Sequence, residues 1–479
     1  MKVILKEAMD QRMASRTELG FYRDLLEKGY PEQILQVEPM GLSGFDGYRP
    51  DIVALAPGLS SDPLAVFDVW AGDVDERLRW LASKAREFCK ANEECAFYMV
   101  AQRPLLSFVY RYDRGTKNFR QVRSIPCYED LVSEWLRGVS HVSGLKLTNV
   151  TLFRSASFGF VGGLNVLIGE NGFGKSTLLK LIYSQAKYAS EYSRRIATGQ
   201  KPPESNLEKV FGLPALSLIT RDCRKPASVK TNFRGKMRGF SELVISSSGM
   251  RMQSYPPARN AIPSVVFLQS HEVLSSYHGY SALWNRYAEN MSRDGTIIDT
   301  VNLLGLPTLR SQPKALQDVC SGLERSIGGR IEIDEKEGRF YFIDGRDDSV
   351  RTAIDMTAEG WRKIGQLLVL LRNGAVAPGS ILIWDEPEAN LNPRLEKVVA
   401  ALLVGIVRAG VQVFVATHSL FFANELDIHL RKTPLESGAK FINLRKGKSA
   451  MSGGSLSEVD NIALIEESMK QSDRFLELD

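Results

Sequence analysis

Short runs made mostly of apolar residues recur in the second part of the chain, and glycine, acidic or hydroxyl residues close most of them. The clearest runs are residues 164–168, 265–268, 381–384 and 411–416. Runs of this length bounded by turn residues are typical of strands buried on both faces, as in parallel sheets. Residues 177–185, which follow the first run, have a helical pattern. We therefore expect an α/β core built around buried strands.

The first 140 residues have a different pattern. Residues 16–28 and 75–91 repeat apolar positions at helical spacing, and shorter apolar segments between and after them read as strands. Those strands are expected at residues 34–37, 51–55, 64–70, 96–101 and 107–112. The small-residue stretch 138–144 reads as a linker. We expect a small α/β domain at residues 1–140 and a larger domain at 145–479.

Composition narrows the class of protein. With 479 residues, 44% of them hydrophobic and 24% charged, the chain reads as an ordinary globular protein of two to four domains. The longest apolar segment, residues 364–371, is ended by Arg372 and Asn373 and is too short for a membrane span. The five cysteines form no CxxC pair, which indicates reduced thiols and a cytoplasmic protein. The net charge of +5 permits nucleic-acid binding without requiring it.

Residues 169–176, GENGFGKS, match the phosphate-loop pattern G-x-x-x-x-G-K-[ST] between a predicted strand and a predicted helix. The glycines let successive backbone N–H groups face phosphates, and the helix N-terminus adds partial positive charge. Lys175 is expected to reach the β- and γ-phosphates of ATP, and the Ser176 hydroxyl to ligate Mg²⁺. The expected nucleotide-binding residues of this segment are Gly169, Asn171, Gly172, Gly174, Lys175, Ser176 and Thr177.

The run 381–384 ends in Asp385 and Glu386, at the end of a strand where ligands bind in parallel sheets. We expect Asp385 to hold Mg²⁺ through water and Glu386 to act as the general base for the attacking water. The run 411–416 leads to His418, which is expected to sense the γ-phosphate. A chance glycine turn, an acidic turn or a lone polar histidine is common singly, but all three in this order favour a nucleotide site.

This order resembles the ABC-type ATPase superfamily, in its SMC/RecF-like branch, over residues 145–426. The resemblance implies a P-loop NTPase head with a helical and β insert at about 190–350. Residues 145–154, LKLTNVTLFR, resemble the first strand of that branch, which implies that Arg154 contacts the phosphates. Gln269 stands at a Q-loop position, which implies a place near the nucleotide and Mg²⁺, and residues 388–393 resemble a D-loop.

ABC-type heads close two nucleotides between two copies, each offering a serine–glycine helix N-terminus to the other. The matching segment here is residues 356–363, MTAEGWRK, where Ala358 stands at the serine position and Gly360 is retained. The resemblance implies that both contact the partner's nucleotide in a homodimer. Glu359 is electrostatically unfavourable beside phosphates unless Arg362 or Lys363 offsets it.

The insert has no coiled-coil pattern, which argues against an SMC arm. We expect a helical segment at 275–304 and a hairpin at 330–344. Residues 221–238 carry seven Lys/Arg against one Asp, with Phe233 among them. This stretch is either a solvated face or a contact with the phosphate backbone of DNA or RNA.

The N-terminal domain resembles the PD-(D/E)xK restriction-endonuclease fold. The resemblance places Asp51 and Asp68 at metal positions, with Glu18 as a third carboxylate, and puts Trp70 where the fold carries its lysine. An indole cannot supply that charge, so we expect a degenerate module that recognises or docks a partner. A substitute lysine, Lys84, and an unrelated α/β domain are the alternatives.

Three functions remain open from the sequence. The first is an ATPase of bacterial anti-phage defence, whose nucleotide-driven dimerisation controls an effector protein such as a nuclease or toxin, or a nucleic acid. The second is a RecF-like repair or maintenance ATPase that acts directly on DNA. The third is a nuclease that acts through the N-terminal domain. None of the three involves a membrane.

Overall fold

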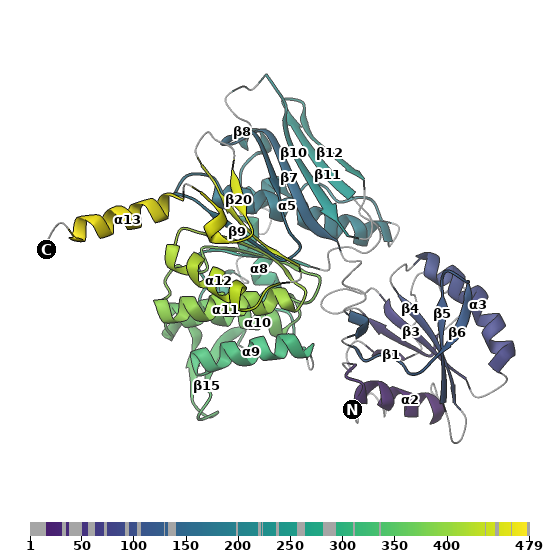
Figure 1. Cartoon of the computed structure of the whole chain (residues 1–479). Coiled ribbons are helices and arrows are strands. Elements are labelled where there is room, and N and C mark those ends of the chain that lie inside the picture. Colours follow the sequence, from purple (N-terminus) through teal and green to yellow (C-terminus); the bar gives the residue numbers. More distant parts are fainter. Residues whose placement is uncertain are drawn as a thin grey trace. The chain divides into compact units, whose positions relative to one another are not determined.

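A computed structural model describes most of the chain, which divides into two compact units, residues 1–139 with 309–313 and residues 140–308 with 314–479 (Figure 1). The described residues are 16–30, 35–37, 50–55, 63–70, 74–91, 95–102, 107–128, 130–132, 140–197, 200–218, 222, 224–235, 239–255, 264–280, 294–309, 312–334, 337–435, 437–445, 450–460 and 462–476.

The first unit is a mixed sheet between two helices. Its strand order is β1-β2-β3-β4-β5-β6, in which only β3 and β4 pair in parallel, through the crossover helix α3. Its elements are α2 (Arg16–Glu27), β1 (Leu35–Val37), β2 (Ile52–Leu55), β3 (Pro63–Trp70), α3 (Val74–Ala91), β4 (Ala96–Gln102), β5 (Ser107–Asp113) and β6 (Asn118–Val122). The predicted helices and strands of this region are confirmed within a few residues.

The alternation of side chains along β3 explains the two layers. Phe67 points to the α2 face and packs with Phe21 and Leu25, whereas Val66 points to the α3 face. Each helix of this unit thus covers one apolar face of the sheet.

The second unit is built on a sheet of order β13-β17-β18-β9-β19-β20. Its strands pair in parallel except β20, which pairs with β19 in the antiparallel direction. The strands are β9 (Leu164–Ile168), β13 (Val265–Leu268), β17 (Ile381–Asp385), β18 (Gln412–Thr417), β19 (Ala439–Asn443) and β20 (Met451–Gly453). The apolar runs at 164–168, 265–268, 381–384 and 411–416 are therefore strands, as predicted.

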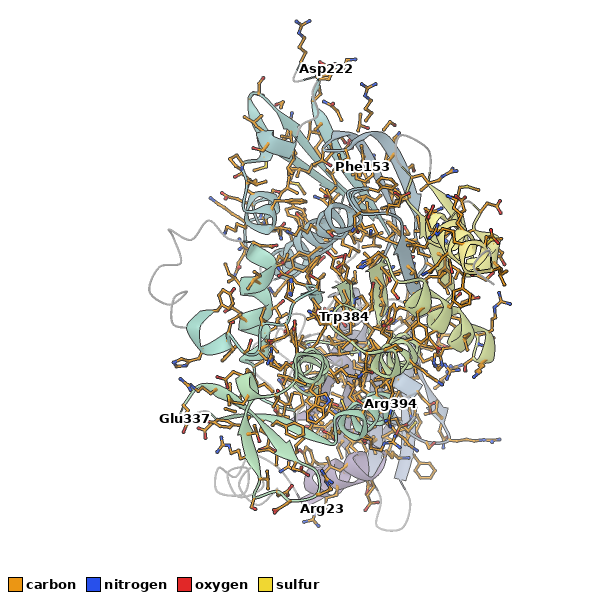
Figure 2. The ribbon with its side chains drawn as sticks, turned by 90° about the vertical axis from the view of Figure 1, so that its left-hand side faces the viewer. Arg23, Phe153, Asp222, Glu337, Trp384 and Arg394 are labelled. Atoms are coloured by element: carbon orange, nitrogen blue, oxygen red, sulfur yellow. The ribbon has the colours of Figure 1, made fainter. Side chains whose placement is uncertain are left out.

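Helices cover both faces of this sheet (Figure 1). Helix α5 packs on the face that carries Ile383 and Phe414, whereas α10, α11 and α12 share a core with the opposite face. Trp384 lies in that second core and is 1% exposed (Figure 2). The helices and 3₁₀ turns of this unit are α5 (Lys175–Ala197), α6 (Leu207–Phe211), η2 (Ala215–Leu218), α8 (Gly295–Leu304), α9 (Lys314–Ile327), η3 (Ile354–Met356), α10 (Glu359–Arg372), α11 (Pro393–Arg408), α12 (Leu420–Lys432), η4 (Leu456–Glu458) and α13 (Ala463–Leu476).

Two further sheets complete the unit. An antiparallel sheet has the order β12-β11-β10-β7-β8, and a smaller one has the order β14-β15-β16. Their strands are β7 (His141–Val150), β8 (Phe153–Gly159), β10 (Ala227–Arg234), β11 (Gly239–Ser246), β12 (Gly249–Tyr255), β14 (Gly329–Asp334), β15 (Arg339–Asp344) and β16 (Arg351–Ala353). The antiparallel pairing of β14 with β15 confirms the hairpin predicted at 330–344.

The region expected as an insert contributes to the main body of the unit. Strands β10 to β12 extend the sheet begun by β7 and β8, since β10 pairs with β7. The inward side chains of Val229 and Leu243 lie in the same core as α5. The helix expected at 275–304 is only partly observed. Residues 274–276 form a turn, residues 277–280 are helical, residues 281–293 lie outside the described part, and α8 begins at Gly295. In the part of the chain that the structure describes, no helix is long and apolar enough to cross a membrane.

Candidate nucleotide site

The parallel sheet brings three predicted site segments to one edge. Thr417 of β18 lies opposite Ile168 of β9, and Asp385 of β17 lies opposite Ala416 of β18. The phosphate loop, the acid pair and His418 therefore leave adjacent strands at the same level. Carboxyl ends of parallel strands are the usual position of ligand sites in such sheets.

The loop after β9 has a backbone that only glycine tolerates at its key positions. Gly169 has φ +154°, and a Cβ there would lie 2.8 Å from the carbonyl oxygen of Leu444. Gly174 has φ +88°, and a Cβ there would lie 3.0 Å from the ring of Phe153. The chain turns directly from this loop into α5 at Lys175. The loop and the helix N-terminus together form an arrangement that suits anion binding.

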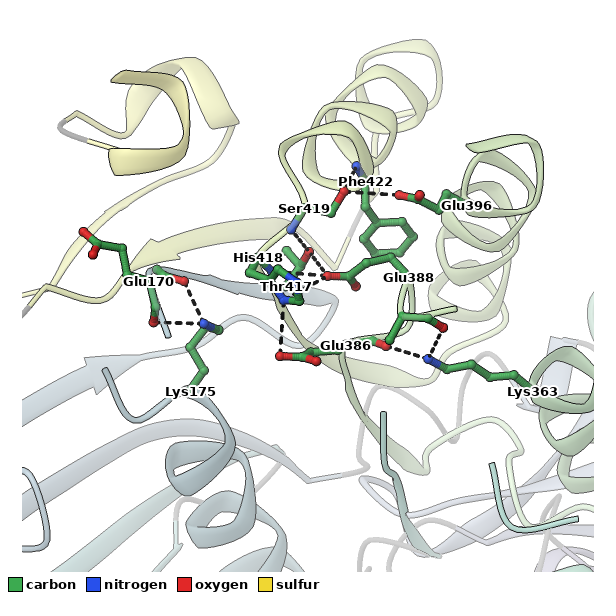
Figure 3. Close-up of polar contacts among 12 residues, drawn as sticks. Glu170, Lys175, Lys363, Glu386, Glu388, Glu396, Thr417, His418, Ser419 and Phe422 are labelled. Carbon is green, nitrogen blue, oxygen red and sulfur yellow. Dashed lines mark hydrogen bonds and ion pairs between the residues drawn. The ribbon is translucent and has the colours of Figure 1, made fainter. Parts of the chain in front are cut away.

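Lys175 is the first residue of α5, and its side chain folds back over the loop (Figure 3). Its Nζ donates hydrogen bonds to the carbonyl oxygens of Gly169, at 2.7 Å, and Glu170, at 3.1 Å. Burial lowers the pKa of Lys175, while the carboxylates of Glu386 and Asp385 oppose that shift. A phosphate would provide this buried ammonium with a charged partner that the carbonyls do not.

Asp385 and Ser176 fit a magnesium site. The Ser176 hydroxyl hydrogen-bonds the Asp385 carboxylate, while the buried Oδ1 of Asp385 has no hydrogen-bond partner among the described residues. Burial is the main cause that raises the pKa of Asp385. An unpartnered buried carboxylate oxygen is costly, and hard divalent cations prefer such oxygens. In the described residues no group of three or more His, Cys, Asp or Glu could hold a metal, so phosphate oxygens and water would complete the coordination.

Glu386 and His418 face each other across the strand ends (Figure 3). His418 Nδ1 lies 3.2 Å from Glu386 Oε1, and the backbone N–H of Glu386 donates to the carbonyl oxygen of Ala416 at 2.9 Å. Glu386 also has φ +47°, an uncommon backbone conformation for a residue with a side chain. Such conformations concentrate at functional sites, where the surrounding structure stabilises them.

Glu388 is a site residue that sequence reasoning placed only within a D-loop. Its buried carboxylate Oε1 accepts hydrogen bonds from the Thr417 hydroxyl, at 2.7 Å, and from the His418 backbone N–H, at 3.2 Å. Glu388 therefore fixes the loop that carries His418. The available signal was a third acid in the segment 385–388, directly after Pro387.

Gln269 and Arg154 occupy the margins of the site. Leu268 lies opposite Trp384, so Gln269 is level with Asp385 on the neighbouring strand. Its amide nitrogen donates to the Thr296 hydroxyl at 2.8 Å and so connects β13 to the start of α8. Arg154 is exposed on β8, next to Phe153, whose ring covers Gly174. Asn171, Gly172 and Ser176 are exposed on the loop, and Thr177 is half-buried at the start of α5.

The signature segment begins α10 as expected, with Ala358 as its N-cap residue. Gly360 packs tightly, since a Cβ there would lie 3.1 Å from Leu391. Of the two residues named as possible offsets for Glu359, Arg362 instead pairs with the buried carboxylate of Glu272 at 2.8 Å. Glu359 instead accepts a hydrogen bond from the Asn390 amide at 2.7 Å.

Lys363 does not pair directly with Glu359 either. Its Nζ donates to the carbonyl oxygens of Glu386 and Ala389 (Figure 3). Glu359 still acts on it electrostatically, because that carboxylate is one of the charges that favour the ammonium form.

Side chains of the basic stretch 221–238 that lie on β10 alternate between the core and the outer face of the sheet. Lys230 and Arg234 point outward, whereas Phe233 is buried in the core. Phe233 is therefore unable to stack on a nucleic-acid base. Residues 221, 223 and 236–238 of the stretch lie outside the described part.

In the first unit, an arginine forms an ion pair with Asp68, one of the two carboxylates predicted to bind a metal. Asp68 is fully buried, and Arg77 of α3 donates to both of its oxygens, at 3.0 Å and 2.6 Å. The guanidinium also stacks on the rings of Trp70 and Trp80. Asp51 accepts a hydrogen bond from the Val69 backbone N–H at 2.6 Å.

A fixed cation at both Asp68 oxygens competes directly with a metal ion, so the predicted vestigial pair Asp51 and Asp68 does not fit magnesium in this arrangement. The other two candidates add little here. The side chain of Glu18 lies outside the described residues, and Lys84 is a half-buried residue of α3.

Replacing Arg77 with methionine is expected to destabilise the chain by about 3–5 kcal/mol, because it leaves the buried Asp68 carboxylate without its cation. Thermal or urea unfolding of the full chain measures this. The double variant Arg77→Met/Asp68→Leu is expected to recover much of the loss, since an apolar pair carries no uncompensated charge. If Arg77→Met unfolds like wild type, the pair does not stabilise this unit.

A comparison with family models finds a match that lies almost entirely within the second unit. Residues 278–424 match a family model described as "AAA domain, putative AbiEii toxin, Type IV TA system". This segment therefore resembles an AAA-type ATPase domain. It contains β17, β18, Glu386 and His418, whereas the phosphate loop precedes it.

Solved SMC head domains show a distant likeness. The SMC head bound to the C-winged helix domain of ScpA has a TM-score of 0.42 at 13% identity, covering 66% of this chain and 98% of that chain. The SMC head with an extended coiled coil bound to the C-terminal domain of ScpA, derived from Pyrococcus furiosus, gives 0.39 at 14%, covering 70% and 99%. The SMC head from Thermotoga maritima gives 0.36 at 12%, covering 66% and 98%. No curated protein matches the sequence.

Proposed function

We propose that this chain is an ABC-type ATPase that hydrolyses ATP with Mg²⁺ and uses nucleotide-driven dimerisation to control an effector. The observation that carries this proposal is the meeting of Lys175, Asp385, Glu386 and His418 at one edge of a parallel sheet. A phosphate-binding loop facing an acid pair is the arrangement that phosphoryl transfer to water needs. The test is ATP turnover by the purified chain, with phosphate release as the readout.

In this proposal each side chain has a defined task. Lys175 and the loop N–H groups bind the β- and γ-phosphates, and Ser176 with Asp385 would hold Mg²⁺, which supplies charge neutralisation when bound. Glu386 accepts a proton from the water that attacks the γ-phosphorus, and the bond from that phosphorus to the β–γ bridging oxygen breaks. His418, 3.2 Å from Glu386, holds that carboxylate in place and contacts the γ-phosphate.

A homodimer would complete the site. The N-cap of α10 makes no side-chain capping bond, so the first N–H groups of this helix suit the partner's phosphates. Apolar side chains are exposed near the start of α10, where Met356 is 79% exposed, and beside the phosphate loop, where Leu152 is 65% exposed. Light scattering after size-exclusion chromatography, with and without ATP, tests this association. An ATP-independent monomer would oppose it.

The partner is proposed to be a toxin or nuclease effector of an anti-phage defence system, docked by the N-terminal unit. The description of the matched family, which names a toxin–antitoxin system, supports this proposal. The Arg77–Asp68 pair supports docking over cleavage by the first unit. Co-purification from the native operon tests it. Recovery of the protein encoded next to this chain is expected, and its absence under ATP-bound conditions would contradict the proposal.

Direct action on DNA is a second candidate, favoured by one observation. The outward positions of paired strands β7 and β10 place Lys146 beside Lys230 in the antiparallel sheet, and Arg234 follows on β10. Lys230 also forms an ion pair with Glu242 of β11, at 3.4 Å. Such a basic face suits a phosphate backbone. ATP turnover stimulated by duplex DNA without any partner protein would favour this candidate. Unchanged turnover at low salt would exclude it.

A further inference from the structure

Lys363 is a buried cation that the predicted mechanism leaves unused. It lies in the first turns of α10 and is only 3% exposed. Its Nζ donates hydrogen bonds to the backbone carbonyl oxygens of Glu386, at 2.6 Å, and Ala389, at 3.0 Å (Figure 3). Both acceptors belong to the turn that follows the acid strand β17.

That turn holds Glu386 in its uncommon backbone conformation. The N–H of Glu386 is fixed by the Ala416 carbonyl oxygen of β18, and its own carbonyl oxygen accepts from Lys363 and from the Ala389 N–H, at 3.1 Å. With φ at +47°, the residue needs such support on both sides. The direction in which its carboxylate projects therefore depends on the Lys363 contact.

Keeping a lysine at this position has a cost. Burial lowers the pKa of Lys363 to about 8, although Glu388, Glu386 and other carboxylates favour its charged form. Its neighbours Ile364 and Leu367 lie in an apolar core, where methionine would pack without desolvating a charge. A side chain retained at such cost, and bonded to the backbone of a proposed general base, indicates a role in positioning.

We infer that Lys363 is a positioning residue for ATP hydrolysis, which acts through Glu386 by fixing the backbone that carries its carboxylate. This inference rests on the proposed ATPase function and extends it. Because Lys363 belongs to α10, the helix proposed to contact the partner's nucleotide, a shift of that helix on dimer closure is transmitted directly to the general base. Hydrolysis is thereby linked to the position of the signature helix.

The test compares Lys363→Met with wild type and with Lys397→Met, a matched change at an exposed lysine of α11. ATP turnover at saturating ATP and ATP-induced thermal stabilisation are measured on the full chain. Lys363→Met is expected to lose roughly 100-fold in turnover, because a small misplacement of a reacting group has that effect. Its stabilisation by ATP is expected to equal that of wild type. Lys397→Met should behave as wild type in both assays.

Three further variants separate positioning from folding. In a Glu386→Gln background, Lys363→Met is expected to add no further loss, since both changes affect the same carboxylate. Lys363→Arg, which keeps charged donors, is expected to retain more turnover than Lys363→Gln. This comparison tests the positioning role even if the methionine variant is insoluble.

Three results would overturn the inference: wild-type turnover in Lys363→Met, a loss that multiplies with that of Glu386→Gln, or equal loss in the arginine and glutamine variants. Absence of ATP turnover in both wild type and Lys397→Met is a different result. It would refute the proposed ATPase function itself, and the inference with it.

Discussion

Replacing Glu386 with glutamine is expected to lower ATP turnover by about 10²–10⁴-fold, the range that a positioned general base contributes. The amide keeps the size of the side chain but cannot accept the proton of the attacking water. Binding of ATP should persist, because Lys175 and the loop backbone are unchanged. Phosphate release measures turnover, and light scattering with ATP should show a trapped dimer.

The matched control is Glu467→Gln, on the exposed helix α13, which should turn over ATP as wild type does. Turnover at the wild-type rate in Glu386→Gln would show that another group activates the water. Loss of ATP binding together with turnover would assign Glu386 to the phosphate pocket instead.

Replacing Lys175 with alanine is expected to abolish nucleotide binding. The buried ammonium of Lys175 is the charged group that the loop offers to the phosphates. Burial lowers its pKa, and its hydrogen bonds go to carbonyl oxygens rather than to an anion. At ATP concentrations of about 100 times Kd, wild type gains about 2.7 kcal/mol of stability, and the variant should gain none. Melting temperature with and without ATP measures this difference.

Lys187→Ala provides the control on the same helix. Its ammonium pairs with Asp299 of α8, away from the loop, so this variant should keep its stabilisation by ATP even if its own melting point falls. A normal ATP-induced shift in Lys175→Ala would show that Lys175 is not the phosphate lysine.

The buried strands and the phosphate loop could be predicted from the sequence for a physical reason. A strand covered on both faces is mostly apolar, so β9, β17 and β18 appear as nearly continuous apolar runs, in which the buried amides of Asn165 and Gln412 are hydrogen-bonded. The loop glycines are required locally, by positive φ and by close contacts with Leu444 and Phe153. Features that depend only on neighbouring residues can therefore be predicted from a short stretch of sequence.

The contacts that arrange the site could not be predicted, because they join residues far apart in the chain. Lys363 reaches the Glu386 carbonyl from another helix, and Glu388 bonds the backbone of His418 from another strand end. A buried lysine within a helical pattern looks the same in sequence as an exposed one. The pairing of Arg362 with Glu272 could not be predicted for the same reason, since Glu272 lies on a separate segment.

The first unit shows the same limit. Helix and strand positions followed from apolar periodicity, and Trp70 in place of the expected lysine was visible in the sequence. The guanidinium of Arg77 on Asp68 was not, because nothing in the helical pattern of α3 shows which face that arginine takes. Only the fold brings α3 against the end of β3.

The most direct test of the nucleotide site is a crystal structure of the full chain with Mg²⁺ and a non-hydrolysable ATP analogue. The account predicts the triphosphate on residues 169–176, with Lys175 Nζ on its β- and γ-oxygens and the carboxylates of Asp385 and Glu386 facing the γ-phosphate. An analogue bound elsewhere, or bound with both carboxylates turned away from its γ-phosphate, would contradict it.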